Sequence, residues 1–264
     1  MTDRRTTPDP SVVDGATPAQ VSVPVLDLST QPNGPRDRQL ILGDTITVLG
    51  ARDELSYVRS DKDGYVGYVA RRGICSRTEP THRISAIATH VYEDPDFKSP
   101  DRMSLSYGSV VTVIGGAGKF IETAHGYIPA QHVAELGFHG SDPVAVASLF
   151  LGTPYLWGGN SSFGIDCSGL IQAALIACGT ECPGDSDQQM QAFYRYIVTD
   201  GSLRRGDLLF WRGHVALASG RNALIHANAH HMAVTIEDAG AAIKRIAEQG
   251  DGPLLAHLRP VLPA

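Results

Sequence analysis

The stretch YLWGGNSSFGIDCSGL, residues 155–170, leads out of a glycine-rich turn and delivers Cys167 to the start of an apolar-periodic helix. Asp166 stands where a helix N-cap belongs. The free backbone N–H groups and the partial positive charge of a helix start favour thiolate over thiol, so we expect a nucleophilic Cys167 with a lowered pKa. A buried structural thiol is the alternative. The apolar positions on the same helix face are Leu170, Ile171, Ala174, Leu175 and Cys178.

Three strands are predicted downstream, over residues 208–211, 214–218 and 223–227. The loop between the last two decides whether His214 and His226 meet. A loop of three residues puts both histidines on one face as diagonal neighbours, whereas a loop of two puts them on opposite faces. We predict the three-residue loop, which pairs Ser219 with Ala223. A helix over 241–248 and a strand over 254–258 should follow, and we assign them no chemistry.

These side chains would supply a nucleophile, a base and an orienting group. Cys167 would attack, His214 would accept and return the proton, and His226 would hold the imidazole through its other nitrogen. A zinc site made by the same three residues is an alternative, because thiolate and imidazole are zinc ligands. A metal-bound thiolate would lose its use as a nucleophile, so we expect no metal and no other cofactor.

The first half of the chain contains an internal duplication. Residues 40–50 recur as residues 105–115, with each matched position displaced by 65 residues. The short strands, separated by Gly, Asp and Pro, predict a small all-β barrel for each copy. Tyr68 and Tyr127 occupy matched positions and are expected in the two cores. Tyr65 lies in a stretch that is longer in the first copy. We therefore expect it to be free for binding, or else to be an exposed loop aromatic.

Composition describes an ordinary globular chain, with 42% hydrophobic residues, 19% charged residues and a net charge of −6. The acidic balance and the scattered basic residues argue against nucleic acid as a partner. The four cysteines form neither a disulfide framework nor paired metal-ligand spacing. Residues 1–19 are predicted to be a disordered lead without a secretory signal. With no apolar segment of membrane length, we expect a cytoplasmic protein without a membrane partner.

Two resemblances follow from these features. Residues 20–80 and 81–138 resemble bacterial SH3-like domains. Residues 139–264 resemble the NlpC family of papain-like cysteine peptidases, through the motifs YLWGG, DCSGL, RGDL, HVA and IHA. The resemblance implies an α+β papain-like catalytic domain preceded by two small all-β SH3-like barrels. It also implies a triad of Cys167, His214 and His226, with the backbone N–H of Cys167 in the oxyanion hole.

The order of the domains resembles the γ-D-glutamyl-L-diamino acid endopeptidases of murein peptide recycling. That resemblance implies hydrolysis of the bond between γ-D-Glu and meso-diaminopimelate or L-Lys, in a murein tripeptide or tetrapeptide with a free N-terminal L-Ala. The L-Ala of intact peptidoglycan is amide-linked to muramic acid. A closed pocket for the free amine would therefore reject intact peptidoglycan.

The resemblance also carries over a set of substrate-binding residues. The α-carboxylate of D-Glu needs donors, which Ser168 and Ser186 can provide. The charged amine needs acceptors, for which Asp166 and Tyr65 are available together with either Asp37 or Asp44, a choice that stays open. The predicted binding set is Tyr65, Tyr155, Trp157, Asp166, Ser168, Asp185 and Ser186.

Plainer interpretations accompany these residues. Asp166 could serve only as an N-cap, Trp157 could be a core residue, and Asp185 with Ser186 could cap a helix that begins near Asp187. At the level of function, the alternatives are a catalytically silent cell-wall-binding scaffold and an amidase or acyltransferase on the same fold.

Overall fold

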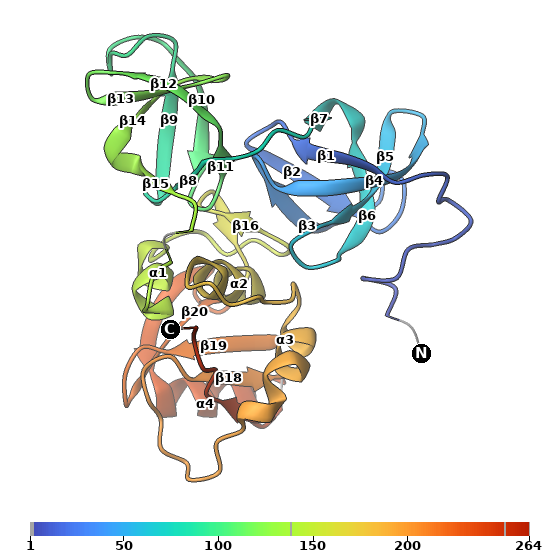
Figure 1. The fold of residues 1–264 in the computed structure, drawn as a ribbon. Helices are drawn as coiled ribbons and strands as arrows, with labels where there is room; N and C mark the ends of the chain where they lie inside the picture. Colours follow the sequence, from blue (N-terminus) through green and yellow to red (C-terminus); the bar gives the residue numbers. More distant parts are fainter. Residues whose placement is uncertain (1–2, 138, 251, 264) are drawn as a thin grey trace. The chain divides into compact units, whose positions relative to one another are not determined.

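The computed structural model describes residues 3–137, 139–250 and 252–263. The chain divides into two compact units, Met1–Phe138 and His139–Ala264 (Figure 1). Across the described residues, no helix has both the length and the apolar character needed to cross a membrane. The first unit is built from strands, and the second combines helices with a sheet.

The N-terminal part of the first unit is a seven-stranded sheet with the strand order β3-β2-β6-β5-β4-β1-β7. Its pairs are antiparallel, and its core includes Leu28, Leu40, Ile46 and Val58, each fully buried. The strands are β1 Thr17–Val21, β2 Val25–Ser29, β3 Arg36–Ile41, β4 Thr45–Arg52, β5 Leu55–Ser60, β6 Val66–Ala70 and β7 Ile74–Ser76.

The rest of the first unit repeats this arrangement in a shorter form. A five-stranded sheet has the order β10-β9-β14-β13-β12, and a three-stranded sheet has the order β11-β8-β15. The strands are β8 His82–Ile84, β9 Ala88–Tyr92, β10 Asp101–Ser106, β11 Val110–Val111, β12 Val113–Ala117, β13 Phe120–Thr123, β14 Gly126–Pro129 and β15 Val133–Glu135.

Residues matched by the sequence duplication take the same structural roles. Leu40 and Leu105 are both fully buried, and Gly43 and Gly108 both adopt left-handed backbone angles, with φ of 82° and 85°. Most residue types avoid that region of φ, so the two glycines are needed for the turns. The matched tyrosines differ, because Tyr68 is buried while the expected burial of Tyr127 is wrong: it is only half-buried.

The expectation of a disordered lead over residues 1–19 is wrong for the residues that the structure describes. The backbone N–H of Val66 donates to the carbonyl O of Arg5 at 2.7 Å, and that of Asp14 donates to Leu49 at 2.8 Å. The strand β1 already begins at Thr17. The lead is therefore held by backbone hydrogen bonds to the first sheet, which its low content of large apolar residues did not reveal.

The second unit places helices on both faces of a five-stranded sheet with the order β21-β20-β19-β18-β22. Helix α2 contacts β19 and β20, and helix α4 contacts β20 and β21. The elements are α1 Pro143–Leu149, β16 Asn160–Ser161, β17 Gly164–Ile165, α2 Cys167–Ala177, α3 Ser186–Phe193, β18 Leu208–Trp211, β19 His214–Ala218, β20 Ala223–Asn228, β21 Ala233–Asp238, α4 Ala239–Glu248 and β22 Ala256–Leu258.

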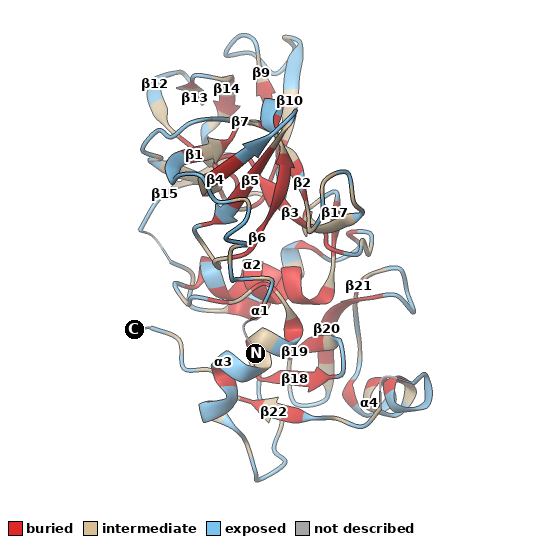
Figure 2. Cartoon of the chain, turned by 90° about the vertical axis from the view of Figure 1, so that its right-hand side faces the viewer, coloured by how far each residue is buried: buried red, intermediate tan, exposed pale blue. Residues whose placement is uncertain are grey.

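Burial follows the predicted patterns in this unit. Figure 2 shows α2 and the strands β18 to β20 as largely buried, whereas α4 exposes its outer side. The five apolar positions expected on the face of Cys167 are each at most 1% exposed. A separate cluster on the other face of the sheet joins Leu209, Trp211, Ala216, Ala218 and Leu224 to Ala239, Ala242 and Ile246 of α4.

The predicted three-residue hairpin loop is confirmed. The backbone N–H of Ser219 donates to the carbonyl O of Ala223 at 2.8 Å, and Leu217 stands opposite Ile225. This register brings His214 and His226 to one face of the sheet. Strand β21 was not predicted, and the helix expected over 241–248 begins two residues earlier, where the Asp238 side chain accepts from the N–H of Ala241.

Candidate active site

Cys167 is the first residue of α2, and Asp166 is its N-cap as predicted, with φ −98° and ψ 179°. The thiol is 7% exposed. It donates to the carbonyl O of Gly213 at 3.9 Å, and the backbone N–H of Val215 also bonds to the sulfur. The sulfur therefore lies against the backbone on either side of His214, although no hydrogen bond joins it to that imidazole within the described chain.

The pKa of the Cys167 thiol moves in the direction opposite to the expectation. Burial raises it to about 12, and repulsion by the neighbouring Asp166 carboxylate adds to the rise. The backbone N–H groups of Val215, Ser168 and Cys167 lower the pKa but do not outweigh the burial. Without a substrate, the site therefore holds a neutral thiol.

The two predicted histidines meet. Nε2 of His214 lies 2.8 Å from Nδ1 of His226, with the ring centroids 5.0 Å apart. The residue His226 is fully buried. Burial lowers the pKa of His214 to about 3, and it also lowers the pKa of His226 despite a hydrogen bond to a carboxylate. Both imidazoles are therefore neutral near pH 7.

Glu237 and Arg245, which the sequence did not single out, extend this pair. Nε2 of His226 lies 2.6 Å from Oε1 of Glu237 on β21, and Arg245 of α4 pairs with the same carboxylate. Burial would raise the pKa of Glu237, but hydrogen bonds from His226 and Arg245 lower it overall. The available signal was the alternation of residues 233–238, which marks a strand beside β20 and puts Glu237 on the face of His226.

Asp166 and Ser168 form a connected group at the start of α2. Oδ1 of Asp166 accepts from the N–H of Gly169 at 2.7 Å and from Oγ of Ser168 at 3.0 Å, while Oδ2 accepts from the N–H of Gly158 at 3.0 Å. Asp166 is thus an N-cap that also holds the glycine-rich turn. Its predicted role in substrate binding has to coexist with these bonds.

The two predicted aromatic binding residues precede this group. Tyr155 is half-buried, and its backbone N–H donates to Met232 at 2.9 Å. Trp157 is 66% exposed, so the alternative that it is a core residue is wrong. An exposed tryptophan offers a flat apolar surface to a ligand.

Asp185 and Ser186 lie at the start of α3, as the alternative interpretation had it. Asp185 occupies the N-cap position without a side-chain capping bond, and Ser186 is the first helical residue. Gln189 on the same helix is fully buried, and its Nε2 donates to the carbonyl O of Ser168 at 2.9 Å. This amide ties α3 to the start of α2, so Ser186 and Ser168 belong to joined elements.

The remaining predicted binding residues lie in the first unit. Tyr65 is 2% exposed, so it is not an exposed loop aromatic, and its hydroxyl donates to Oδ2 of Asp37 at 2.8 Å. Asp44 instead accepts from the N–H of Ile41 at 2.9 Å and pairs with Lys62 at 2.6 Å. Of the two acids, only Asp37 is joined to Tyr65, which favours Asp37 as its partner.

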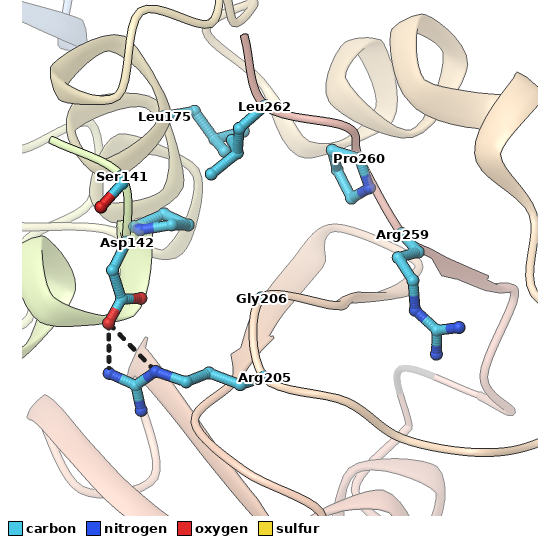
Figure 3. Close-up of a pocket in the computed structure, with 9 residues that line it drawn as sticks. Ser141, Asp142, Leu175, Arg205, Gly206, Arg259, Pro260 and Leu262 are labelled. Carbon is cyan, nitrogen blue, oxygen red and sulfur yellow. Dashed lines mark hydrogen bonds and ion pairs between the residues drawn. The ribbon is translucent and has the colours of Figure 1, made fainter. Parts of the chain in front are cut away.

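A pocket in the second unit is separate from all of these residues (Figure 3). Asp142, the N-cap of α1, pairs across it with Arg205 at 2.7 Å. Nearby, the buried Asp207 accepts from Arg259 at 2.7 Å and lies 2.7 Å from Nε2 of His257. The RGDL motif therefore contributes to structure. The pocket is lined by Ser141, Asp142, Pro143, Leu175, Arg205, Gly206, Arg259, Pro260 and Leu262.

The zinc alternative has no support in the geometry. Across the described residues, no three His, Cys, Asp or Glu side chains are grouped in a way that could hold a metal ion. The four cysteines are free thiols, of which Cys75 is exposed and Cys167, Cys178 and Cys182 are buried.

Both units of the chain match families of known proteins. Residues 152–247 match the model of the NlpC/P60 family, and residues 28–74 match the bacterial dipeptidyl-peptidase SH3 domain. A γ-D-glutamyl-L-lysine dipeptidyl-peptidase of Bacillus subtilis is 28% identical over 71% of this chain and 67% of its own length. Dipeptidyl-peptidase 6 of Lysinibacillus sphaericus is 37% identical, but the match spans 38% of this chain and 36% of that protein.

A solved structure shares the fold along most of the chain. The crystal structure of an NlpC/P60 family protein from Bacillus cereus superposes with a TM-score of 0.77 over 94% of this chain and 100% of that one, at 20% identity. The chain thus carries an NlpC/P60 domain and a bacterial SH3 domain, and it is homologous to γ-D-glutamyl-L-lysine dipeptidyl-peptidases.

Proposed function

We propose that this protein is a cysteine peptidase that hydrolyses the bond between γ-D-Glu and a diamino acid, meso-diaminopimelate or L-Lys, in muropeptides with a free N-terminal L-Ala. The observation that carries the proposal is the position of Cys167, at a helix start and against the backbone on both sides of His214. The name of the Bacillus subtilis relative specifies the same class of bond.

The first half of the proposed reaction acylates the sulfur. Nδ1 of His214 accepts the thiol proton as Sγ of Cys167 attacks the carbonyl carbon of D-Glu. The carbonyl oxygen gains the negative charge, and the backbone N–H of Cys167 donates to it. His214 then passes the proton to the departing amine, the C–N bond breaks and a thioester remains on the sulfur.

The second half releases the dipeptide. Water attacks the thioester while His214 takes one of its protons, and the sulfur leaves as thiolate. The proton returns to the sulfur, and L-Ala-γ-D-Glu departs. Because the resting thiol is neutral, proton transfer to His214 must accompany the attack.

Selectivity for a free amine is the second part of the proposal. Asp37 and Tyr65 pair a half-buried carboxylate with a buried hydroxyl, which is the chemistry that an alkylammonium group requires. An acylated L-Ala brings no positive charge, so it would gain no ion pair with the Asp37 carboxylate. Ser168 and Ser186 are the proposed donors to the α-carboxylate of D-Glu, and the Ser168 hydroxyl would exchange its bond to Asp166 for one to the substrate.

Liquid chromatography of L-Ala-γ-D-Glu-meso-diaminopimelate after incubation with the full chain tests the reaction. We expect release of L-Ala-γ-D-Glu, no release by Cys167→Ala and full release by Cys178→Ala, which removes a buried thiol at the other end of the same helix. An intact tripeptide, or a Cys167→Ala variant with full activity, would refute the proposal.

The same assay with N-acetylated tripeptide and with intact sacculi tests the selectivity. The wild type should cleave both at least about 100-fold more slowly, because neither substrate carries the ammonium group that the Asp37 carboxylate is proposed to bind. Tyr65→Phe and Asp37→Asn should raise KM for the free tripeptide, whereas Asp44→Asn should not. Cleavage of sacculi as fast as of the free tripeptide would contradict the proposed selectivity.

We also propose a cytoplasmic place in murein peptide recycling, with released tripeptide or tetrapeptide as the partner. The four free thiols are the state expected in a reducing compartment. Fractionation of cells that produce the tagged full-length protein tests this, and recovery outside the cytoplasm would refute it.

A further inference from the structure

A line of four side chains leads from the proposed base to the outer edge of the second unit. His214 on β19 bonds to His226 on β20, which bonds to Glu237 on β21, which pairs with Arg245 on α4. The line lies on the face of the sheet that α4 covers, because Trp211 and His214 stand opposite each other and Trp211 belongs to the cluster with α4.

The carboxylate of Glu237 fixes the direction of the two hydrogen bonds that His226 makes with Glu237 and with His214. A carboxylate has no proton to donate, so the bond of 2.6 Å between Glu237 and His226 requires a proton on Nε2 of His226. Nδ1 of the same neutral ring is then an acceptor. The bond of 2.8 Å from His214 must therefore use a proton on Nε2 of His214, which leaves the lone pair on Nδ1.

We propose that Glu237 is a positioning residue that sets both histidine tautomers, so that Nδ1 of His214 carries the lone pair needed to accept the Cys167 proton. The inference rests on the proposed function for its catalytic meaning. Its structural content, the direction of two hydrogen bonds, does not depend on turnover.

The charged groups around the line support this assignment. Arg245 keeps the Glu237 carboxylate ionised, and its guanidinium also donates to the side chain of Gln249 at 3.0 Å. His231, 4.0 Å from the carboxylate, is the other titratable group that faces it, and Cys167 of α2 lies beside the backbone of His214. Asp166 is the acid that acts on the Cys167 thiol, whereas Glu237 is the acid that bonds to the histidine pair.

The carboxylate has a second effect during the reaction. When His214 accepts the thiol proton, the Glu237 carboxylate stabilises the imidazolium charge through His226 and does not itself take up a proton. Glutamine at position 237 keeps the size of the side chain but can either accept from His226 or donate to it. A donating amide would reverse both bonds and place a proton on Nδ1 of His214.

Nitrogen-15 NMR of the full chain with labelled histidine tests the tautomers directly. At pH 7.5 we expect His214 and His226 to be protonated on Nε2 in the wild type. Glu237→Gln should give a mixture with a proton on Nδ1 of His214. Glu248→Gln, a change to an exposed acid on α4, the helix of Arg245, is the matched control and should leave both signals unchanged.

Kinetics with the tripeptide supplies the second measurement. Glu237→Gln should lower kcat about 100-fold, the usual contribution of a positioned general base, with KM within about twofold. The acidic limb of its profile of kcat/KM against pH should move to lower pH, because the imidazolium loses its anionic neighbour. A side chain with a purely structural role would change stability without moving that limb.

Two results would overturn the inference. One is a wild-type spectrum with the proton of His214 on Nδ1, which needs no variant to interpret. The other is a folded Glu237→Gln protein with wild-type tautomers and a wild-type pH profile. If the wild type shows the expected tautomers but cleaves no tripeptide, the proposed function fails while the assignment of Glu237 stands.

Discussion

At Cys167, burial and the helix start act on the thiol in opposite directions. Three backbone N–H groups favour the thiolate, while the loss of water and the charge of Asp166 disfavour it, and the second pair of effects wins. The sequence shows where the helix begins but not how deeply its first turn is covered. That depth is why a lowered pKa could be expected from the sequence while the structure gives a raised one.

The state of this thiol predicts a particular pattern of alkylation by iodoacetamide. Because the pKa of Cys167 is about 12, the thiolate fraction and the rate should rise about tenfold with each pH unit between pH 7 and 10. Peptide mass spectrometry separates Cys167 from the exposed Cys75. A rate at Cys167 that is already level below pH 8 would indicate a preformed thiolate and contradict the expectation.

Asp166 permits a second test at the same scale. Asp166→Asn keeps an acceptor for the N–H of Gly169 but removes the charge that raises the thiol pKa. Alkylation of Cys167 at fixed pH should become about tenfold faster, the equivalent of about 1.4 kcal/mol of lost repulsion. Asp166→Ala also loses the N-cap and should lower the free energy of unfolding by about 1 kcal/mol or more. An unchanged alkylation rate in Asp166→Asn would show that its charge does not reach the sulfur.

At the scale of elements, the sequence predicted those parts whose signals are local. The N-cap of α2, the strands β18 to β20 and the three-residue loop follow from capping residues, apolar runs and the parity of side chains in a strand. Strand β21 was missed because only Val234 of its six residues is buried and no strong apolar run marks it. Glu237 was missed with it, since its contacts with His226 on β20 and Arg245 on α4 depend on tertiary packing.

Gly169 shows how closely α2 packs against the turn that precedes it. A Cβ at this position would lie 2.4 Å from Oδ1 of Asn160 and 2.6 Å from the carbonyl O of Gly159, closer than atoms can approach. Alanine is the better helix former by up to about 1 kcal/mol, but we expect Gly169→Ala to destabilise the second unit by about 1–3 kcal/mol through overpacking.

The control for this substitution is Gly240→Ala in α4. The nearest atom to a new Cβ there is Oδ1 of Asp238 at 3.3 Å, so the cost should be small. Both tryptophans of the chain, Trp157 and Trp211, belong to the second unit, so urea denaturation followed by tryptophan fluorescence measures this unit alone. Equal stabilities of the two variants would mean that the turn can move away from α2.

At the scale of the whole molecule, the desolvated His214 connects the site to stability. His214 is neutral in the folded protein with a pKa of about 3, and an unfolded histidine titrates near pH 6.5. Below that pH the unfolded chain binds a proton that the folded chain does not. The stabilisation is thus complete above pH 6.5 and is lost progressively as the pH falls towards 3.

This argument gives a measurable difference between pH 7 and pH 5. The wild type should lose about 2 kcal/mol more free energy of unfolding over this interval than His214→Gln, because 1.5 pH units below 6.5 contribute about 1.4 kcal/mol each. The interval stays above the range in which the paired carboxylates of Asp142, Asp207 and Glu237, whose pKa values are lowered, take up protons. Urea denaturation with tryptophan fluorescence at both pH values measures the difference, with the surface variant His230→Gln expected to follow the wild type. If His214→Gln loses as much stability as the wild type, the imidazole is not held neutral by burial.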